Sequence, residues 1–246
     1  MDNGRGKGEN IRVGKLRVVS YNDDVFQDRQ EAGRLLGDVL KDLPGSETVV
    51  LGIPRGGMVV AEQIYRRLNS ELDIVLARKI RAPADPELAI GSISEDGRFF
   101  LNKDLVLQVN ADKDYIKQEK LHQLAEIKNR LQKFRRFKNK VPLKGKIVVV
   151  TDDGVATGST MLAALWASFR EEPKRLIAAI PVGARSSLEL LVNQADEVIV
   201  LRAPKYLGAV SGFYAHFNQV SDEEVLEILQ KSVKEKIILE KIKEKK

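Results

Sequence analysis

Apolar residues recur along this chain with two spacings, and the spacings predict an ordered series of helices and strands. Residues 26–43 and 112–140 place apolar side chains three or four positions apart, which predicts helices. Short runs of mostly branched apolar residues are typical of strands buried on both faces of a sheet. Such runs occupy residues 48–53, 72–78, 147–150, 174–182 and 196–201.

Further helical segments lie between and after these strands, beginning near residues 54, 160 and 221 and covering 185–195. Residues 90–102 instead predict a hairpin that turns at Asp96-Gly97, a pair suited to positive φ. The alternation of strands and helices indicates an α/β fold built on a parallel sheet. The side chains expected to face the core from the two longest helical patterns are Phe26, Leu35, Leu36, Val39 and Leu40, and Leu121, Leu124, Ile127, Leu131 and Phe134.

Composition narrows the class of protein without changing this architecture. The 246 residues are 43% hydrophobic and 31% charged, which fits one globular domain with embellishments. The absence of cysteine excludes disulfides and thiolate metal sites. No segment has the pattern of a secretion signal or a membrane span, so we expect a cytoplasmic protein without a membrane partner. A net charge of +6 favours anionic partners, either phosphorylated small molecules or nucleic acid.

Residues 147–160, IVVVTDDGVATGST, combine a buried strand with an unusual end. Asp152 and Asp153 place two like charges at the carboxyl end of the strand, where open α/β sheets bind ligands. Thr157-Gly158-Ser159-Thr160 then opens a helix, and backbone N–H groups at a helix N-terminus bind phosphate. Carboxylates accept hydrogen bonds from the vicinal hydroxyls of a ribose. A ribose 5-phosphate would satisfy both halves of the segment.

Other interpretations of this segment explain less of it. A P-loop would need a glycine-lysine-Ser/Thr ending, and a dinucleotide fingerprint would need GxGxxG after the first strand; the sequence has neither. Simple capping of the following helix would explain one aspartate but not two beside TGST.

A second anion loop is predicted after residues 48–53. Pro54-Arg55-Gly56-Gly57 follows this strand, and its glycines permit a tight turn that aims N–H groups and Arg55 at an anion. An ordinary strand-to-helix turn with an exposed arginine is the alternative. Arg78 and Lys79 close the next predicted strand, where they either neutralise a pyrophosphate or form a solvated basic pair. Residues 81–90, RAPADPELAI, predict either a mobile cover or an ordered surface loop.

These segments together resemble the type I phosphoribosyltransferases. IVVVTDDGVATGST is similar to the ribose-phosphate motif of that family, and GIPRGGMVVAEQI is similar to its pyrophosphate loop. LARKIRAPADPELAIGSI resembles the next strand and flexible loop of a bacterial and archaeal branch of predicted phosphoribosyltransferases. The resemblance implies a Rossmann-like parallel-sheet core with flanking helices, a β-hairpin flexible loop and a small helical hood. It also implies an arm at 1–20, the enzyme domain at 21–232 with a long basic helix inserted at 111–140, and a charged tail at 233–246.

The resemblance assigns a role to each of these motifs. The implied activity is that of a pentosyltransferase, which binds 5-phosphoribosyl 1-pyrophosphate with Mg²⁺ and transfers ribose 5-phosphate to a nitrogenous base. Asp152 and Asp153 would be catalytic and would hold the metal, and Lys79 would also be catalytic. The 5-phosphate would bind Ala156, Thr157, Gly158, Ser159 and Thr160, and the pyrophosphate would bind Arg55, Gly56, Gly57, Arg78 and Lys79.

The acceptor base is not fixed by the sequence. Purine-salvage relatives often carry a third acid where this chain has Ala156, which argues against hypoxanthine or guanine. Tyr206, Phe213 and Tyr214 follow the last predicted strand, and they either stack on a base or pack against the core.

Two further classes of function stay open at this point. The basic residues of the long helix fit a regulatory sensor of the same ligand that contacts nucleic acid, although no nucleic-acid-binding module is visible. The same pocket would also suit a nucleotide hydrolase or phosphorylase. The long helix could equally be solvated, cover the base pocket or form the contact of a homodimer.

Overall fold

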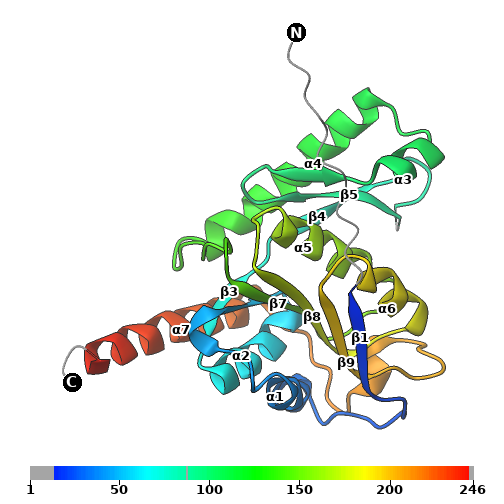
Figure 1. Cartoon of the computed structure of the whole chain (residues 1–246). Coiled ribbons are helices and arrows are strands. Elements are labelled where there is room, and N and C mark those ends of the chain that lie inside the picture. The colour runs from blue at the N-terminus through cyan, green and yellow to red at the C-terminus, as the bar shows by residue number, and fades with distance from the viewer. Residues whose placement is uncertain (1–13, 87, 244–246) are drawn as a thin grey trace.

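The computed structural model describes residues 14–86 and 88–243, and a six-stranded parallel sheet lies at its centre (Figure 1). The strand order is β1–β9–β8–β7–β2–β3. The bounds are β1 (Lys15–Ser20), β2 (Thr48–Gly52), β3 (Glu71–Ile74), β7 (Ile147–Thr151), β8 (Arg175–Val182) and β9 (Glu197–Arg202). Every residue of β2 and β7 is buried, as expected for strands covered on both faces. The predicted α/β class is confirmed.

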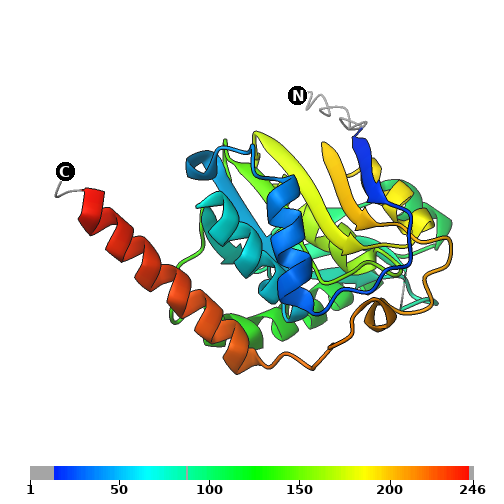
Figure 2. The same cartoon turned by 90° about the horizontal axis from the view of Figure 1, so that it is seen from below.

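Helices cover both faces of this sheet. As a result, alternate residues of the central strands belong to two separate hydrophobic cores. Val149 of β7 packs in a cluster with residues of α1 (Arg29–Val39), α2 (Gly56–Leu68) and α7 (Asp222–Lys243). Val148 and Val150 pack instead against α5 (Ser159–Phe169) and α6 (Arg185–Val192). The carboxyl end of α7 projects away from the body (Figure 2). No helix in the described part of the chain is long and apolar enough to cross a membrane.

A second, three-stranded antiparallel sheet lies beside the main sheet. It consists of β4 (Ala77–Arg81), β5 (Ala89–Ser94) and β6 (Phe99–Leu101), followed by α3 (Lys103–Gln108) and α4 (Lys113–Phe134). The predicted hairpin at Asp96-Gly97 is confirmed, with Gly97 at φ +78°. The single strand predicted at 72–78 is wrong, since β3 ends at Ile74 and β4 begins a new sheet three residues later. Arg78 and Lys79 therefore belong to the smaller sheet.

Other boundaries differ because tertiary contacts override the apolar spacing. Phe26 is buried but pairs with Tyr214 before α1 begins, and Asp28 caps that helix. Leu121 was expected in the core and is 62% exposed, because α4 instead buries Glu119 and Gln123 beside Ile127.

Two elements of the structure, β1 and α3, were not predicted. β1 lies within the predicted arm at 1–20, and α7 continues through the predicted tail to Lys243; the proposed domain boundaries stay predictions.

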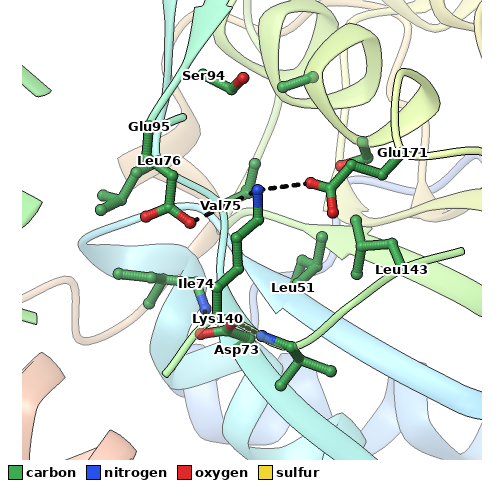
Figure 3. A pocket seen from close by; sticks show the side chains of 13 residues that line it. Leu51, Asp73, Ile74, Val75, Leu76, Ser94, Glu95, Lys140, Leu143 and Glu171 are labelled. Atoms are coloured by element: carbon green, nitrogen blue, oxygen red, sulfur yellow. Dashed lines mark hydrogen bonds and ion pairs between the residues drawn. The ribbon is translucent and has the colours of Figure 1, made fainter. Parts of the chain in front are cut away.

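The segment after α4 is fixed to the main sheet by an ionic cluster, and Figure 3 shows its part around Asp73, Glu95, Lys140 and Glu171. Arg135 donates to Asp73 at 2.7 Å and to both oxygens of Glu95 at 2.7 and 2.8 Å. Lys140 pairs with Glu171 of the segment after α5 at 2.8 Å. Asp73 also accepts the backbone N–H groups of Ile74 and Val141. The space inside this cluster is about 20 Å³, enough for one water but not for a ligand, so the cluster is an anchor for the smaller sheet and α4.

Candidate active site

Two turns meet at the carboxyl edge of the main sheet. The turn after β2 is joined to the end of β7 by a hydrogen bond from the N–H of Ile53 to the carbonyl of Thr151, 2.9 Å long. The Pro54–Arg55 peptide bond in this turn is cis. A Cβ on Gly56 would lie 2.0 Å from Oδ2 of Asp153, and one on Gly57 would lie 2.8 Å from Cα of Asp152. Glycine is therefore required for the two turns to approach this closely.

Asp152 lies in a half-buried position against the start of α2. Its carboxylate accepts the N–H of Asp153 at 2.9 Å and the N–H of Gly57. Burial, together with the negative charge of Asp153, raises the pKa of Asp152 well above its ordinary value, and the hydrogen bonds and the charge of Arg29 offset only part of this effect. The ionised side chain of Asp152 is therefore energetically unfavourable until a cation or a hydroxyl donor approaches it.

Asp153 has a different partner, Arg29 of α1, which was not among the predicted site residues. Nε of Arg29 lies 2.8 Å from Oδ2 of Asp153, and Nη1 of Arg29 donates to the carbonyl of Asn218 at 2.8 Å. The guanidinium also stacks 3.7 Å from the ring centre of Phe217, and Arg29 is only 8% exposed. These partners are 124 and 189 positions away, so no local pattern in the sequence signals the pair.

The predicted phosphate loop is held rigidly at the start of α5. The N–H of Val155 donates to Val182 at 2.8 Å, and the hydroxyl of Ser187 donates to the carbonyl of Ala156 at 2.5 Å. Gly158, at φ +82°, is the N-cap of α5, and it supplies no side-chain cap. The first N–H groups of a helix have no partner within the helix, so the N-terminus of α5 favours the approach of an anion. The structure therefore brings residues 156–160 together in a form that suits phosphate.

The candidate pyrophosphate residues occupy two places. Arg55 is exposed and precedes α2, beside Gly56 and Gly57. Arg78 and Lys79 of β4 line a separate cavity of about 260 Å³. The cavity is lined by Ile53, Pro54, Val75, Leu76, Ala77, Arg78, Lys79, Arg81, Pro86, Gln123, Ile127, Arg130, Thr160 and Ala163. It thus joins both anion loops to α4.

The three candidate base-stacking residues are not equivalent. Tyr206 is 82% exposed, whereas Phe213 and Tyr214 are buried. Tyr214 packs against the rings of Phe26 and Phe217, with centroids 5.4 and 5.1 Å away, and its hydroxyl donates to the carbonyl of Asp153 at 2.5 Å. Burial raises the pKa of Tyr214. Phe213 and Tyr214 are therefore packed in the core, which was one of the two predicted alternatives. This packing disfavours stacking of either ring on a base.

The donor set fits Mg²⁺ only in part. Asp152 and Asp153 offer the carboxylate oxygens that Mg²⁺ prefers. Within the described residues, no group of three His, Cys, Asp or Glu side chains could hold a metal. An ion here would therefore take most of its ligands from water and from a bound phosphate compound.

A doubly covered parallel sheet with an acidic pair and two glycine turns at its carboxyl edge defines an α/β protein with a candidate sugar-phosphate site. The phosphoribosyl transferase domain matches residues 22–205, and the chain belongs to this family. It is 38% identical over 208 residues to the Mycobacterium tuberculosis protein named "Putative phosphoribosyl transferase Rv0571c". That match covers 85% of this chain and 47% of the relative, so the chain spans about half the length of this relative. The structure is also similar to the crystal structure of TT1426 from Thermus thermophilus, with 42% identity, a TM-score of 0.80 and coverage of 84% of this chain and 98% of that one.

Proposed function

We propose that the protein transfers ribose 5-phosphate from 5-phosphoribosyl 1-pyrophosphate to a nitrogenous base in a magnesium-dependent reaction. The observation that carries this proposal is the direct contact between the Gly56-Gly57 turn and the Asp152-Asp153 pair. This contact puts the N-terminus of α2 beside the acidic pair, and α5 begins six residues after Asp153 in the chain. A ligand with a phosphate at one end and a pyrophosphate at the other matches that arrangement.

Each group has a role that follows from its position. The first turn of α5 would bind the 5-phosphate, and Asp152 would accept hydrogen bonds from the ribose hydroxyls. The N–H groups at Gly56 and Gly57, with Arg55, would hold the pyrophosphate. Asp152 and Asp153 would hold Mg²⁺, which when bound neutralises charge on the pyrophosphate oxygens. Arg29 is a positioning residue, because it fixes the side chain of Asp153.

The reaction needs little covalent participation by the protein. The bond between the anomeric carbon and the pyrophosphate oxygen breaks and leaves its electron pair on the pyrophosphate. A nitrogen lone pair of the base forms the new bond to that carbon; a nitrogen that carries a proton then releases it, and a pyridine-type nitrogen becomes a pyridinium. Positive charge develops on the ribose ring, so the nearby carboxylates stabilise the transition state electrostatically.

Replacement of both acids tests these roles directly. Asp152→Asn combined with Asp153→Asn keeps the shape of the site and removes its negative charge. We expect pyrophosphate release to fall by at least about a thousandfold, because electrostatic groups of this kind contribute roughly 10²- to 10³-fold each. The far-UV circular dichroism spectrum should be unchanged. Turnover close to the wild-type rate in a folded double variant would refute the assignment.

A further inference from the structure

The size and the lining of the cavity between β4 and α4 are not explained by the binding of phosphate and pyrophosphate. Its volume of about 260 Å³ is in the range of a small organic ligand rather than of a few waters. One wall comes from α4, through Gln123, Ile127 and Arg130. Pro54 and Thr160, from the two anion loops, also line the cavity. A molecule bound here would therefore lie next to the proposed ribose site.

Basic side chains line much of the cavity. Arg78, Lys79, Arg81 and Arg130 line it, and no carboxylate does so among residues 14–86 and 88–243. Arg81 pairs with Glu119 at 2.7 Å, but Arg78 donates to the neutral amide oxygen of Gln123 at 2.6 Å. Burial lowers the pKa of Arg78, the negative charges of Glu126 and Glu119 offset part of this effect, and the positive charges of Arg130 and Arg81 add to it. An anion in this cavity would remove these unfavourable interactions.

The rest of the lining is apolar. Ile53, Val75, Leu76, Ile127 and Ala163 contribute carbon surface, together with two prolines. A pyrophosphate has no apolar surface to place against these walls, and the N–H groups at Gly56 and Gly57 offer it a fully polar position elsewhere. A flat ring that carries an acidic group would use both parts of the cavity.

We propose that this cavity binds the acceptor and that the acceptor is a nitrogen heterocycle with an acidic substituent. Arg78 and Arg130 bind its anionic group, and the aliphatic side chains contact its ring. Gln123 is a positioning residue, because its amide oxygen orients the guanidinium of Arg78 and its amide nitrogen is held by Glu119 at 2.8 Å. This inference rests on the proposed transfer reaction and specifies the class of its second substrate.

The first test compares acidic heterocycles with their neutral analogues. Wild-type protein with 5-phosphoribosyl 1-pyrophosphate and Mg²⁺ is given nicotinate or nicotinamide, orotate or uracil, and quinolinate or pyridine, and pyrophosphate release is measured. We expect release with an acidic compound and a kcat/KM at least about tenfold lower for its neutral partner, since a charged hydrogen bond is lost. Release with neutral compounds only, or with none, would overturn the inference.

The second test replaces Arg130, which is exposed enough to be changed without unfolding the protein. Arg130→Gln should raise the KM for the acidic acceptor roughly ten- to hundredfold and leave the Kd for 5-phosphoribosyl 1-pyrophosphate within about twofold of wild type. Lys128→Gln is the matched control, because it removes one charge from the exposed surface of the same helix outside the cavity. We expect it to change neither constant.

The Kd for 5-phosphoribosyl 1-pyrophosphate and the KM for the acceptor also separate the proposed transfer reaction from the proposed acidic acceptor. If Arg130→Gln weakens the binding of 5-phosphoribosyl 1-pyrophosphate and leaves the acceptor KM unchanged, the cavity belongs to the pyrophosphate and the inference fails. If the wild-type protein does not bind 5-phosphoribosyl 1-pyrophosphate at all, the transfer reaction itself is wrong. Binding with turnover of neutral bases alone would leave the transfer reaction intact and overturn only the acidic acceptor.

Discussion

The two neighbouring aspartates of the site differ in what holds them. Asp153 is paired with the buried cation of Arg29, whereas the carboxylate of Asp152 is contacted by backbone N–H groups and lies beside a like charge. Ionised Asp152 therefore destabilises the free protein, and a ligand with hydroxyl groups or a bound cation would relieve that cost. The ionised site thus lowers the folding stability of the free protein, as expected for a binding site.

Asp152→Asn should consequently stabilise the free protein while it impairs function. Because the folded-state pKa of Asp152 is raised, ionisation costs stability as pH increases above the unfolded value of about 4. The variant should melt about 2 °C higher than wild type at pH 7, which corresponds to roughly 0.5–1 kcal/mol for a chain of this size. The difference should shrink toward pH 4. Thermal melts across this pH range measure it, and a variant less stable than wild type at pH 7 would contradict the account.

Arg29 offers a second test at the level of single residues. Arg29→Gln removes the partner of Asp153 and should reduce kcat roughly tenfold or more through misplacement of that side chain. It should also lower the unfolding free energy by about 3 kcal/mol, since an uncompensated buried charge remains. Partial recovery of kcat in Arg29→Lys would distinguish positioning from simple destabilisation. Arg34→Gln, on the exposed surface of α1, is the control and should behave as wild type.

Among the elements, the close approach of the turn before α2 to the turn after β7 determines the geometry of the site. Gly56→Ala would place a methyl group 2.0 Å from Oδ2 of Asp153 and 2.8 Å from Nε of Arg29, so the pair has to move. We expect the Kd for 5-phosphoribosyl 1-pyrophosphate to rise about tenfold or more, because misplaced groups lose much of their effect. Gly212→Ala meets nothing within 4 Å and should leave the Kd unchanged. Equal affinities for the two variants would show that the contact is unimportant.

The anchor behind α4 is a structural element rather than a binding site. Asp73→Ala would leave the guanidinium of Arg135 and two backbone N–H groups without their acceptor, and it should lower the unfolding free energy by about 3–5 kcal/mol in urea denaturation. Asp38→Ala breaks the exposed pair with Arg67 and should cost less than about 1 kcal/mol. Losses of similar size in the two variants would argue against the anchor.

Local patterns in the sequence were enough to predict the sheet strands that carry the site. The branched run at 147–150 and the acidic pair after it specify a strand and its end, because burial on two faces leaves a signature within a few residues. Arg29 and the ionic cluster around Asp73 could not be predicted, since their partners lie far away in sequence. β1 was missed because it is an edge strand with Leu16 and Val19 exposed and lacks the buried apolar run of a central strand.

At the scale of the whole molecule, the described chain forms a complete doubly covered sheet with a second sheet and α4 beside it. The excess of basic residues gives a charge of +6, which would favour the approach of a polyanionic substrate. The chain spans about half of its Mycobacterium tuberculosis relative, so the activity of the full relative does not define that of this chain. A homodimer and a cytoplasmic location stay predictions.

Isothermal titration with 5-phosphoribosyl 1-pyrophosphate, in the presence and absence of Mg²⁺, measures directly whether the acidic pair and the two glycine turns bind this ligand. We predict one binding site per chain, dependence on Mg²⁺ and loss of binding in the Asp152→Asn, Asp153→Asn double variant. Absence of binding by the folded wild-type protein, or binding that the double variant retains in full, would mean that the acidic pair and the two glycine turns hold some other ligand.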